Sequence, residues 1–238
     1  MINFIKQIPK AELHIHIEGS LEPLMMFEMA KKNNIKIPYN NVSEVKKAYE
    51  FDNLQSFLDI YYKGAEVLIT KEDFFDLTWG YLLKCHEDNV IHTEIFFDPQ
   101  SHTSRGIKFE TIILGINEAL IKAKKDLNIT SNIIMCFLRH LSQDDAFKTL
   151  EDAFLYKDLI VAVGLDSSEI GHPPSKFEDV FKAALKQGYK TVAHAGEEAD
   201  YTFIYKTIDL LKVSRIDHGV QAINSDELMK DLKESQMP

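Results

Sequence analysis

Short runs of apolar residues alternate along this chain with longer segments in which apolar residues recur every three or four positions. The short runs have the length of buried strands, and the longer segments have the period of amphipathic helices. The predicted strands span residues 12–17, 90–97, 132–138, 159–165, 190–195 and 215–220. Because strands that alternate with helices form parallel sheets, the pattern predicts an α/β fold of repeated strand–helix units.

Three of the intervening helices are predicted to begin at capping boxes, in which a hydroxyl residue is followed three positions later by a carboxylate. The pairs are Thr70 with Asp73, Ser142 with Asp145, and Ser175 with Glu178. Each hydroxyl can accept a hydrogen bond from the first turn of its helix, so these pairs locate three helix starts to within a few residues.

The stretch between the first two predicted strands is unusually long, at roughly seventy residues against about thirty for an ordinary strand–helix repeat. It contains helical patterns near residues 21–32, 42–49 and 54–67. We interpret it as a helical insertion over the C-terminal end of the first strand. Since no repeat, low-complexity tract or Gly/Ser linker interrupts the chain, residues 1–238 are predicted to form a single domain.

The number of predicted strands leaves two architectures open. A closed parallel barrel takes eight strands, whereas six leave the first and last strands with unpaired edges. The sheet is therefore either open and doubly wound, or it belongs to a barrel whose last quarter is absent from these 238 residues.

Composition and charge narrow the class of protein. Hydrophobic residues make up 45% of the chain, which is enough for a folded core, and a formal net charge of −10 argues against a nucleic-acid or membrane partner. Cys85 and Cys136 each lie in an apolar segment, which predicts buried free thiols in a reducing compartment. Because the sequence has neither a signal-peptide pattern nor an apolar run of about 18 residues, the predicted location is the cytoplasm.

The first candidate for chemistry is a pair of histidines on the first predicted strand. Side chains two positions apart on a strand point the same way, so Glu12, His14, His16 and Glu18 are expected to share one face. Two imidazoles about 7 Å apart along a strand can converge on one metal ion. A His-x-His pair alone is weak evidence, because such pairs also occur by chance.

Further polar residues follow the fifth and sixth predicted strands, at the ends where barrel active sites are built. His194 and Glu197 are separated by two small residues, of which Gly196 would let a ligand approach the backbone, and His218 ends the sixth strand. Together with His14 and His16, these residues match a catalytic zinc site with an open position for water. Such a zinc ion lowers the pKa of its water to about 7, and a neighbouring carboxylate and imidazole can handle the proton.

One motif points to a different chemistry and is set aside. His92 and Glu94 match half of the cytidine-type deaminase signature, but the required Pro-Cys-x-x-Cys partner is absent from the sequence. His92 is therefore expected to be a structural residue of the second strand. The same structural role is expected for His86, His102, His140 and His172, although His102 is well placed to lie near the site.

Residues 9–20, 194–197 and 215–219 together resemble the adenosine/adenine deaminase family of zinc amidohydrolases. The order and spacing of these segments match over essentially the whole chain, and the resemblance implies a TIM-type (β/α)8 barrel. It also implies one zinc ion per chain, with His14, His16 and His194 as ligands. By the same resemblance, Glu197 is the proton shuttle to the purine ring and His218 orients and polarises the attacking water.

Several segments resemble the adenine branch of that family more than the adenosine branch. Glu18 stands where the adenosine enzymes have an Asp that binds ribose, and the longer side chain would intrude into the space of the sugar. Residues 96–100 and 164–174 also resemble the adenine branch. The resemblance therefore implies a small-molecule purine base as substrate. The residues expected to contact it are Glu18, Asp98, Ser168, Glu169 and Gly196.

The family has a seventh strand, and an eighth that carries an Asp-Asp pair, and neither has a counterpart in this sequence. The resemblance implies that the first Asp is a zinc ligand and that the second contacts the purine. Together with the strand count, this favours a barrel truncated after its sixth strand. We therefore expect weakened zinc binding and little or no turnover by the 238 residues alone.

The predicted reaction is the hydrolytic deamination of adenine to hypoxanthine and ammonia in purine salvage. The nearest alternative is an adenosine or modified-purine deaminase with the same mechanism. A non-catalytic protein that binds a purine or zinc, and an unrelated zinc hydrolase of amides or phosphoesters, are two further alternatives. The sequence contains no signal for the oligomeric state.

Overall fold

The computed structural model describes residues 1–238, apart from the side chain of Ile2. The described residues form six strands in one sheet, and the order of the strands in the sheet follows their order in the chain. Strand pairs β1/β2, β3/β4, β4/β5 and β5/β6 are parallel. The strands are β1 (Lys10–His16), β2 (Val90–Phe97), β3 (Thr130–Leu138), β4 (Ala162–Asp166), β5 (Lys190–Ala195) and β6 (Arg215–His218).

The chain divides into two compact units, residues 1–133 and residues 134–238, and β3 begins in the first unit and ends in the second. We describe each unit by itself. The expectation of a single domain over residues 1–238 stays a prediction.

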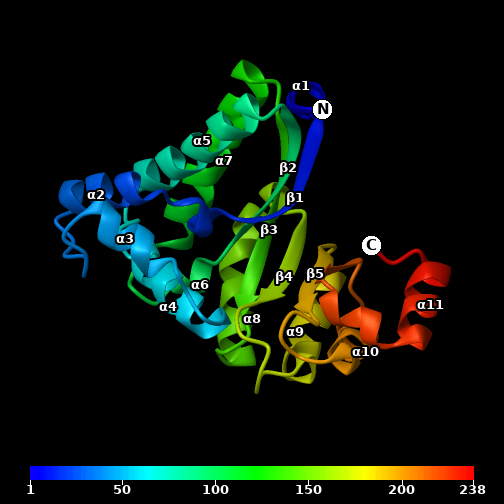
Figure 1. The fold of residues 1–238 in the computed structure, drawn as a ribbon. Helices are drawn as coiled ribbons and strands as arrows, with labels where there is room; N and C mark the ends of the chain where they lie inside the picture. The colour runs from blue at the N-terminus through cyan, green and yellow to red at the C-terminus, as the bar shows by residue number, and fades with distance from the viewer. The chain divides into compact units, whose positions relative to one another are not determined.

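In the first unit β1 pairs with β2, and the long helices lie on one side of this pair (Figure 1). The segment between the two strands contains four of the unit's helices, of which the first three correspond to the predicted helical insertion. Long helices α5 and α7 lie side by side (Figure 1). The helices are α1 (Ile2–Gln7), α2 (Pro23–Lys32), α3 (Val42–Ala48), α4 (Leu54–Ala65), α5 (Lys71–Glu87), α6 (Pro99–Thr103) and α7 (Phe109–Asp126).

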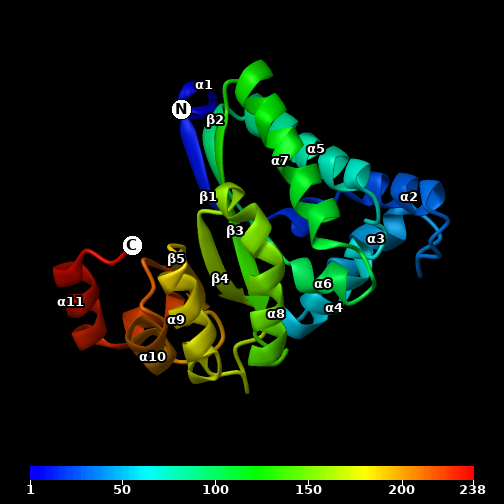
Figure 2. The ribbon, with the colours of Figure 1, turned by 180° about the vertical axis from the view of Figure 1, so that it is seen from behind.

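The second unit continues the alternation of strands and helices. Helices α8 and α9 lie side by side, and α9 and α10 both contact β5 (Figure 2). Ala195, Ile204, Ala222 and Leu228 form a buried cluster next to the end of β5. The helices are α8 (Gln143–Ala153), α9 (Glu178–Lys186), α10 (Tyr201–Leu211) and α11 (Asp226–Ser235), with 3-10 turns η2 (Phe154–Leu159), η3 (Pro174–Phe177) and η4 (Val220–Asn224).

Two of the three predicted helix starts are confirmed. Thr70 and Asp73 form a reciprocal capping box at α5, and the Ser142 side chain accepts the Asp145 N–H at the start of α8. The prediction at Ser175 is wrong, because the Pro173-Pro174 pair starts a 3-10 turn that continues directly into α9. The first N–H groups of α9 instead donate to the side-chain oxygen of Gln143, which belongs to another helix.

Four of the six strands have bounds that differ from the predictions, and one of these differences affects the candidate site. β1 ends at His16, and residues Ile17–Ser20 form the 3-10 turn η1, so Glu18 does not share a strand face with His14 and His16. β3 begins at Thr130, two residues before its predicted start. Leu159 belongs to η2 and precedes β4. The sixth strand ends at His218 because His218 and Gly219 both have positive φ, at 70° and 62°, which turns the chain out of the sheet.

Cys85 and Cys136 are both buried and are not joined in a disulfide bond, as the sequence predicts. Within the described part of the chain, no helix is both long and apolar enough to cross a membrane.

Candidate functional site

His14 and His16 direct their Nε2 atoms toward each other at the end of β1. The two atoms are 3.2 Å apart, and both imidazoles pack against the ring of Phe96 on the neighbouring strand. The register of β1 against β2 shifts between Glu12 and Ile15, and such irregularities re-aim side chains next to functional sites. A regular strand would hold the two side chains about 7 Å apart along its axis, so the irregular pairing accompanies their convergence.

The spacing of these two nitrogens passes a test for a shared metal ion. With Zn–N bonds of about 2.0–2.1 Å and tetrahedral angles, two nitrogen ligands lie about 3.3 Å apart. The other nitrogen of His16, Nδ1, faces the Asp98 carboxylate at 3.7 Å, and metal-binding histidines usually have a carboxylate or carbonyl behind them. Both observations fit a pair of imidazole ligands.

Glu18 lies just past these histidines in a network of buried hydrogen bonds. Its Oε1 accepts from the Asp98 backbone N–H at 3.1 Å, and the Tyr61 hydroxyl, from α4, contacts its Oε2 at 3.3 Å. The same Tyr61 hydroxyl donates to Asp98 Oδ2 at 2.8 Å. Helix α4 of the insertion therefore reaches the end of β1, as the sequence predicts.

His102, which is expected to be structural but well placed to lie near the site, completes this network. Arg105 Nη2 lies 2.9 Å from His102 Nδ1, and a guanidinium has only donors, so Nδ1 must accept. The proton of the imidazole is then on Nε2, which donates to Glu18 Oε1 at 3.0 Å. His102 and Glu18 are both fully buried at their side chains, and this contact gives the Glu18 carboxylate a second donor besides the Asp98 N–H.

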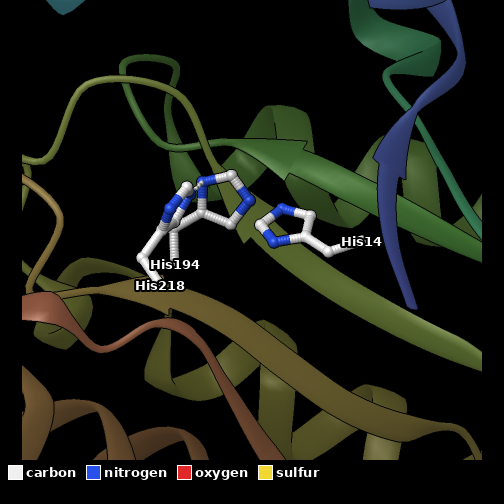
Figure 3. Close-up of side chains that lie close together, drawn as sticks. All are labelled: His14, His194 and His218. Carbon is white, nitrogen blue, oxygen red and sulfur yellow. Dashed lines mark hydrogen bonds between the residues drawn. The ribbon is translucent and has the colours of Figure 1, made fainter. Parts of the chain in front are cut away.

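In the second unit, His194, Glu197 and His218 come together at the ends of β5 and β6. His194 Nδ1 and His218 Nε2 are 3.3 Å apart, with the rings edge to face (Figure 3). Glu197 Oε2 lies 3.4 Å from His218 Nε2 and 3.7 Å from His194 Nδ1. The strand register places His218 beside Ala195, so parallel pairing brings the two imidazoles to the same end of the sheet.

Backbone conformations with positive φ surround this cluster. Gly196 has a φ of 68°, and a Cβ atom there would lie 2.6 Å from Ile204 Cδ1, so any residue with a Cβ would be strained at this position. His218 has a φ of 70°, which is uncommon for a residue with a side chain. Such conformations cluster at functional sites.

Glu169 is fully buried and accepts four hydrogen bonds from consecutive backbone N–H groups. Its Oε1 accepts from Gly196, and its Oε2 accepts from residues 197, 198 and 199, at 2.8–2.9 Å. In the opposite direction, Glu198 Oε2 accepts from the Ser168 hydroxyl at 3.4 Å and from the Glu169 N–H at 3.3 Å. The loops after β4 and β5 are therefore joined by two carboxylates.

Arg139, at the end of β3, is fully buried beside Glu169. Its Nη1 donates to the His194 carbonyl at 3.0 Å and lies 3.6 Å from Glu169 Oε1, and its Nε donates to the His172 carbonyl. Burial lowers the pKa of Arg139, and the neighbouring carboxylate of Glu169 opposes that shift. The guanidinium is the positive charge that balances Glu169.

Each unit contains pairs of potential metal ligands whose ligand atoms lie close together. Within the first unit, His16 and Asp98 offer ligand atoms within 4.8 Å of each other; within the second, His194 with His218 and Cys136 with Asp166 do the same. This donor set is rich in imidazole, which suits first-row transition metals such as zinc.

The structural role expected for the remaining histidines stays a prediction. His92 contacts the Thr130 hydroxyl and stays 4.0 Å from Glu94, and His140 contacts the Ser167 hydroxyl. His86 is exposed on α5, and the backbone of His172 bonds with Glu169 and Arg139.

Tyr61, Arg105 and Arg139 also contribute to these networks, and none of them is among the site residues predicted from the sequence. Arg139 directly follows a long apolar run, and a charged residue at the C-terminal end of a parallel strand is a signal that could have identified it. Tyr61 lies in helix α4 and Arg105 lies in the turn after α6, and neither position has a comparable signal in the sequence.

The sequence matches the adenosine deaminase family over residues 9–238. The chain belongs to this family. An adenine deaminase of Psychrobacter cryohalolentis is 67% identical over 238 residues, which cover 100% of this chain and 72% of that protein. The resemblance inferred from the three sequence segments is confirmed.

Solved structures decide between the two architectures that the sequence left open. The crystal structure of adenine deaminase from Arthrobacter aurescens matches with a TM-score of 0.94 at 42% identity, covering 96% of this chain and 70% of that one. An amidohydrolase from Burkholderia ambifaria, crystallised with bound Zn, matches with a TM-score of 0.91 at 24% identity, covering 99% and 65%. The predicted TIM-type barrel is confirmed, and this chain contains its first six strands.

Proposed function

We propose that this protein catalyses the hydrolytic deamination of adenine, in which adenine and water give hypoxanthine and ammonia. The observation that carries the proposal is the 67% identity, along the whole chain, to an adenine deaminase. The local geometry of His14, His16, His194, Glu197 and His218 supports it, because these side chains converge within each unit.

We further propose that His14, His16 and His194 bind one zinc ion per chain. β1 and β5 belong to one parallel sheet, and both histidine pairs stand at C-terminal strand ends, where barrel enzymes place their sites. The 3.2 Å separation of His14 Nε2 and His16 Nε2 supports a shared ion of zinc-like bond length. When bound, zinc supplies a hydroxide-like nucleophile at neutral pH.

Glu197 and His218 perform the proton transfers in this proposal. Glu197 Oε2 lies 3.4 Å from His218 Nε2, so one proton can be shared between the carboxylate and the imidazole. Glu197 moves a proton from the attacking water to the ring nitrogen beside the reacting carbon. His218 stabilises the negative charge that develops on the water oxygen. The second proton of the water, carried on the oxygen that is now bonded to the carbon, passes to the amino group; the C–N bond then breaks and ammonia leaves.

The proposed substrate is a free purine base, and this assignment rests on Glu18. Its buried carboxylate is held by Asp98, His102 and Tyr61, so its position is fixed. A fixed side chain one methylene longer than Asp would take up the space of a ribose. Asp98, Ser168 and Gly196 are further proposed contacts of the purine.

The deciding experiment measures zinc-dependent loss of adenine absorbance and release of ammonia, with adenosine as the comparison substrate. We expect kcat/KM to be at least about tenfold higher for adenine than for adenosine, which corresponds to about 1.4 kcal/mol of transition-state preference. Glu197→Gln should lower kcat by about 10²- to 10⁴-fold. Glu178→Gln, at an exposed carboxylate of the same unit, is the matched control and should leave kcat unchanged. A preference for adenosine would overturn the assignment of the base.

Two polypeptides should be assayed together. One is the 238-residue chain, and the other is a chimera in which this chain continues into the C-terminal part of the Psychrobacter relative, of which it covers 72%. We expect the chimera to bind one zinc ion and to turn over faster. If the chimera binds adenine but hydrolyses neither purine in the presence of zinc, the protein is a binding protein and not a deaminase.

A further inference from the structure

The loop that carries Glu197 has an anchor that lies outside the proposed reaction. The N–H groups of residues 196–199 all donate to the carboxylate of Glu169, which comes from the loop after the neighbouring strand β4. Successive backbone N–H groups that converge in this way form an anion-binding concavity, and here a side chain of the same unit fills it. Both Glu169 oxygens are thereby committed to the backbone.

The charge of this anchor is balanced inside the protein. Glu169 and Arg139 are both fully buried, with Arg139 Nη1 at 3.6 Å from Glu169 Oε1. The same Nη1 donates to the carbonyl of His194, so one guanidinium contacts the anchor and the strand end that carries a proposed metal ligand. A buried charge pair with this many hydrogen bonds is costly to break, because removing one partner leaves the other unpaired.

We propose that Glu169 is a positioning residue that holds residues 196–199 and thereby fixes Glu197 relative to His194 and His218. The proposal rests on the proposed function in one respect, namely that Glu197 transfers the proton. It replaces the expectation that Glu169 contacts the purine, because four backbone N–H groups already occupy its oxygens. Glu197 itself is only partly buried, so its side chain depends on the backbone for its placement.

The first test uses amide hydrogen exchange and needs no enzymatic activity. In the wild type, one Glu169 oxygen accepts from the N–H of Gly196 and the other accepts from the N–H groups of residues 197–199. In Glu169→Gln, the amide oxygen can replace only one of these two acceptors, and the NH2 group must face the N–H groups on the other side. Exchange at residues 196–199 should become at least about tenfold faster. The matched control is Asp200→Ala, which removes the N-cap of α10 immediately after this loop without touching Glu169. It should leave the exchange of residues 196–199 within about twofold of the wild type.

The second test uses the kinetics of adenine deamination. Misplacing a reacting group by about 1 Å can lower the rate by about 10²-fold, so Glu169→Gln should lower kcat by about that factor while KM changes less than about threefold. In a Glu197→Gln background, Glu169→Gln should cause little further loss, because it acts through the group already removed. Asp200→Ala should retain the wild-type kcat.

These outcomes separate the two proposals. If no deamination is found in any form of the protein, the proposed function fails, and hydrogen exchange still decides whether Glu169 holds the loop. An increase in KM at unchanged kcat would make Glu169 a substrate contact, and multiplicative losses with Glu197→Gln would make the two residues independent. Should Glu169→Gln not fold, Glu169→Asp retains the charge beside Arg139 but shortens the reach, and unchanged exchange in that variant would equally overturn the proposal.

Discussion

Replacing Gly196 by alanine tests whether the turn between His194 and Glu197 is as constrained as it looks. Gly196 is buried with a φ of 68°, and an added Cβ would lie 2.6 Å from Ile204 Cδ1 and 2.9 Å from Cγ1. The end of an isoleucine can normally rotate away. Ile204, however, is fully buried in a cluster with Ala195, Ala222 and Leu228, which leaves it little room to move.

Two terms contribute to the expected loss of stability. Placing a residue with a Cβ in the left-handed region costs about 1–2 kcal/mol. Overpacking a well-filled core typically costs about 1–3 kcal/mol, and we assign this cost to the overlap with Ile204. Gly196→Ala should therefore lower the free energy of unfolding by about 2–5 kcal/mol.

Urea unfolding at equilibrium measures the loss, and comparison with other variants separates the two terms. The urea concentration at the midpoint should fall while the m value stays unchanged. Gly106→Ala is the matched control, because Gly106 also has a positive φ, 85°, but nothing lies within 4 Å of its added Cβ. It should lose only about 1–2 kcal/mol. Ile204→Val removes the nearest atom, so combined with Gly196→Ala it should cost less than the sum of the two single changes. Equal losses for both glycines, together with strict additivity, would refute the steric argument.

Three further changes test other parts of the structure. Burial raises the pKa of Asp73, but hydrogen bonds from backbone N–H groups and from Lys32 more than offset this and hold it below its ordinary value. The carboxylate therefore adds stability at neutral pH that is lost on acidification. The loss of free energy of unfolding caused by Asp73→Asn, measured in urea, should be largest at pH 7 and should shrink below about pH 4. A loss that stays constant with pH would contradict this. Gln143→Ala leaves the first N–H groups of α9 without their acceptor and should lower the thermal midpoint, at a cost of about 1 kcal/mol. His102→Leu removes a donor from a buried carboxylate and should cost about 1–3 kcal/mol in urea unfolding, whereas His86→Leu, at an exposed site, should cost less than about 0.5 kcal/mol.

The sequence was informative wherever local pattern and chemistry coincide. The second and fifth strands were located at their observed bounds, because apolar β-rich runs flanked by turn residues have few alternative structures. Helix starts at Thr70 and Ser142 followed from the local hydrogen bond that a hydroxyl can offer the backbone. Candidate residues such as His14 and His218 were recognised because strand ends carry the site in this architecture.

Long-range contacts were beyond the reach of the sequence. The cap of α9 comes from Gln143 on another helix, and no local pattern at Ser175 reveals that competitor. The anchoring of Glu169 depends on the spatial neighbourhood of two loops, and in sequence its carboxylate looks the same as one that faces a ligand. Glu18 is expected on the same face as His14 and His16 because the alternation continues past His16, whereas the backbone turns into a 3-10 helix at Ile17.

The left-handed backbone at residue 218 favours glycine, whereas the proposed reaction needs the imidazole of His218. Glycine would relieve an unfavourable conformation of the order of 1 kcal/mol there, so a population of variants selected only for thermal stability should accumulate His218→Gly. A population selected for growth on adenine as a nitrogen source should retain histidine. Comparing the two selections would show whether this residue is kept for the reaction or for the fold, without any measurement on the purified protein.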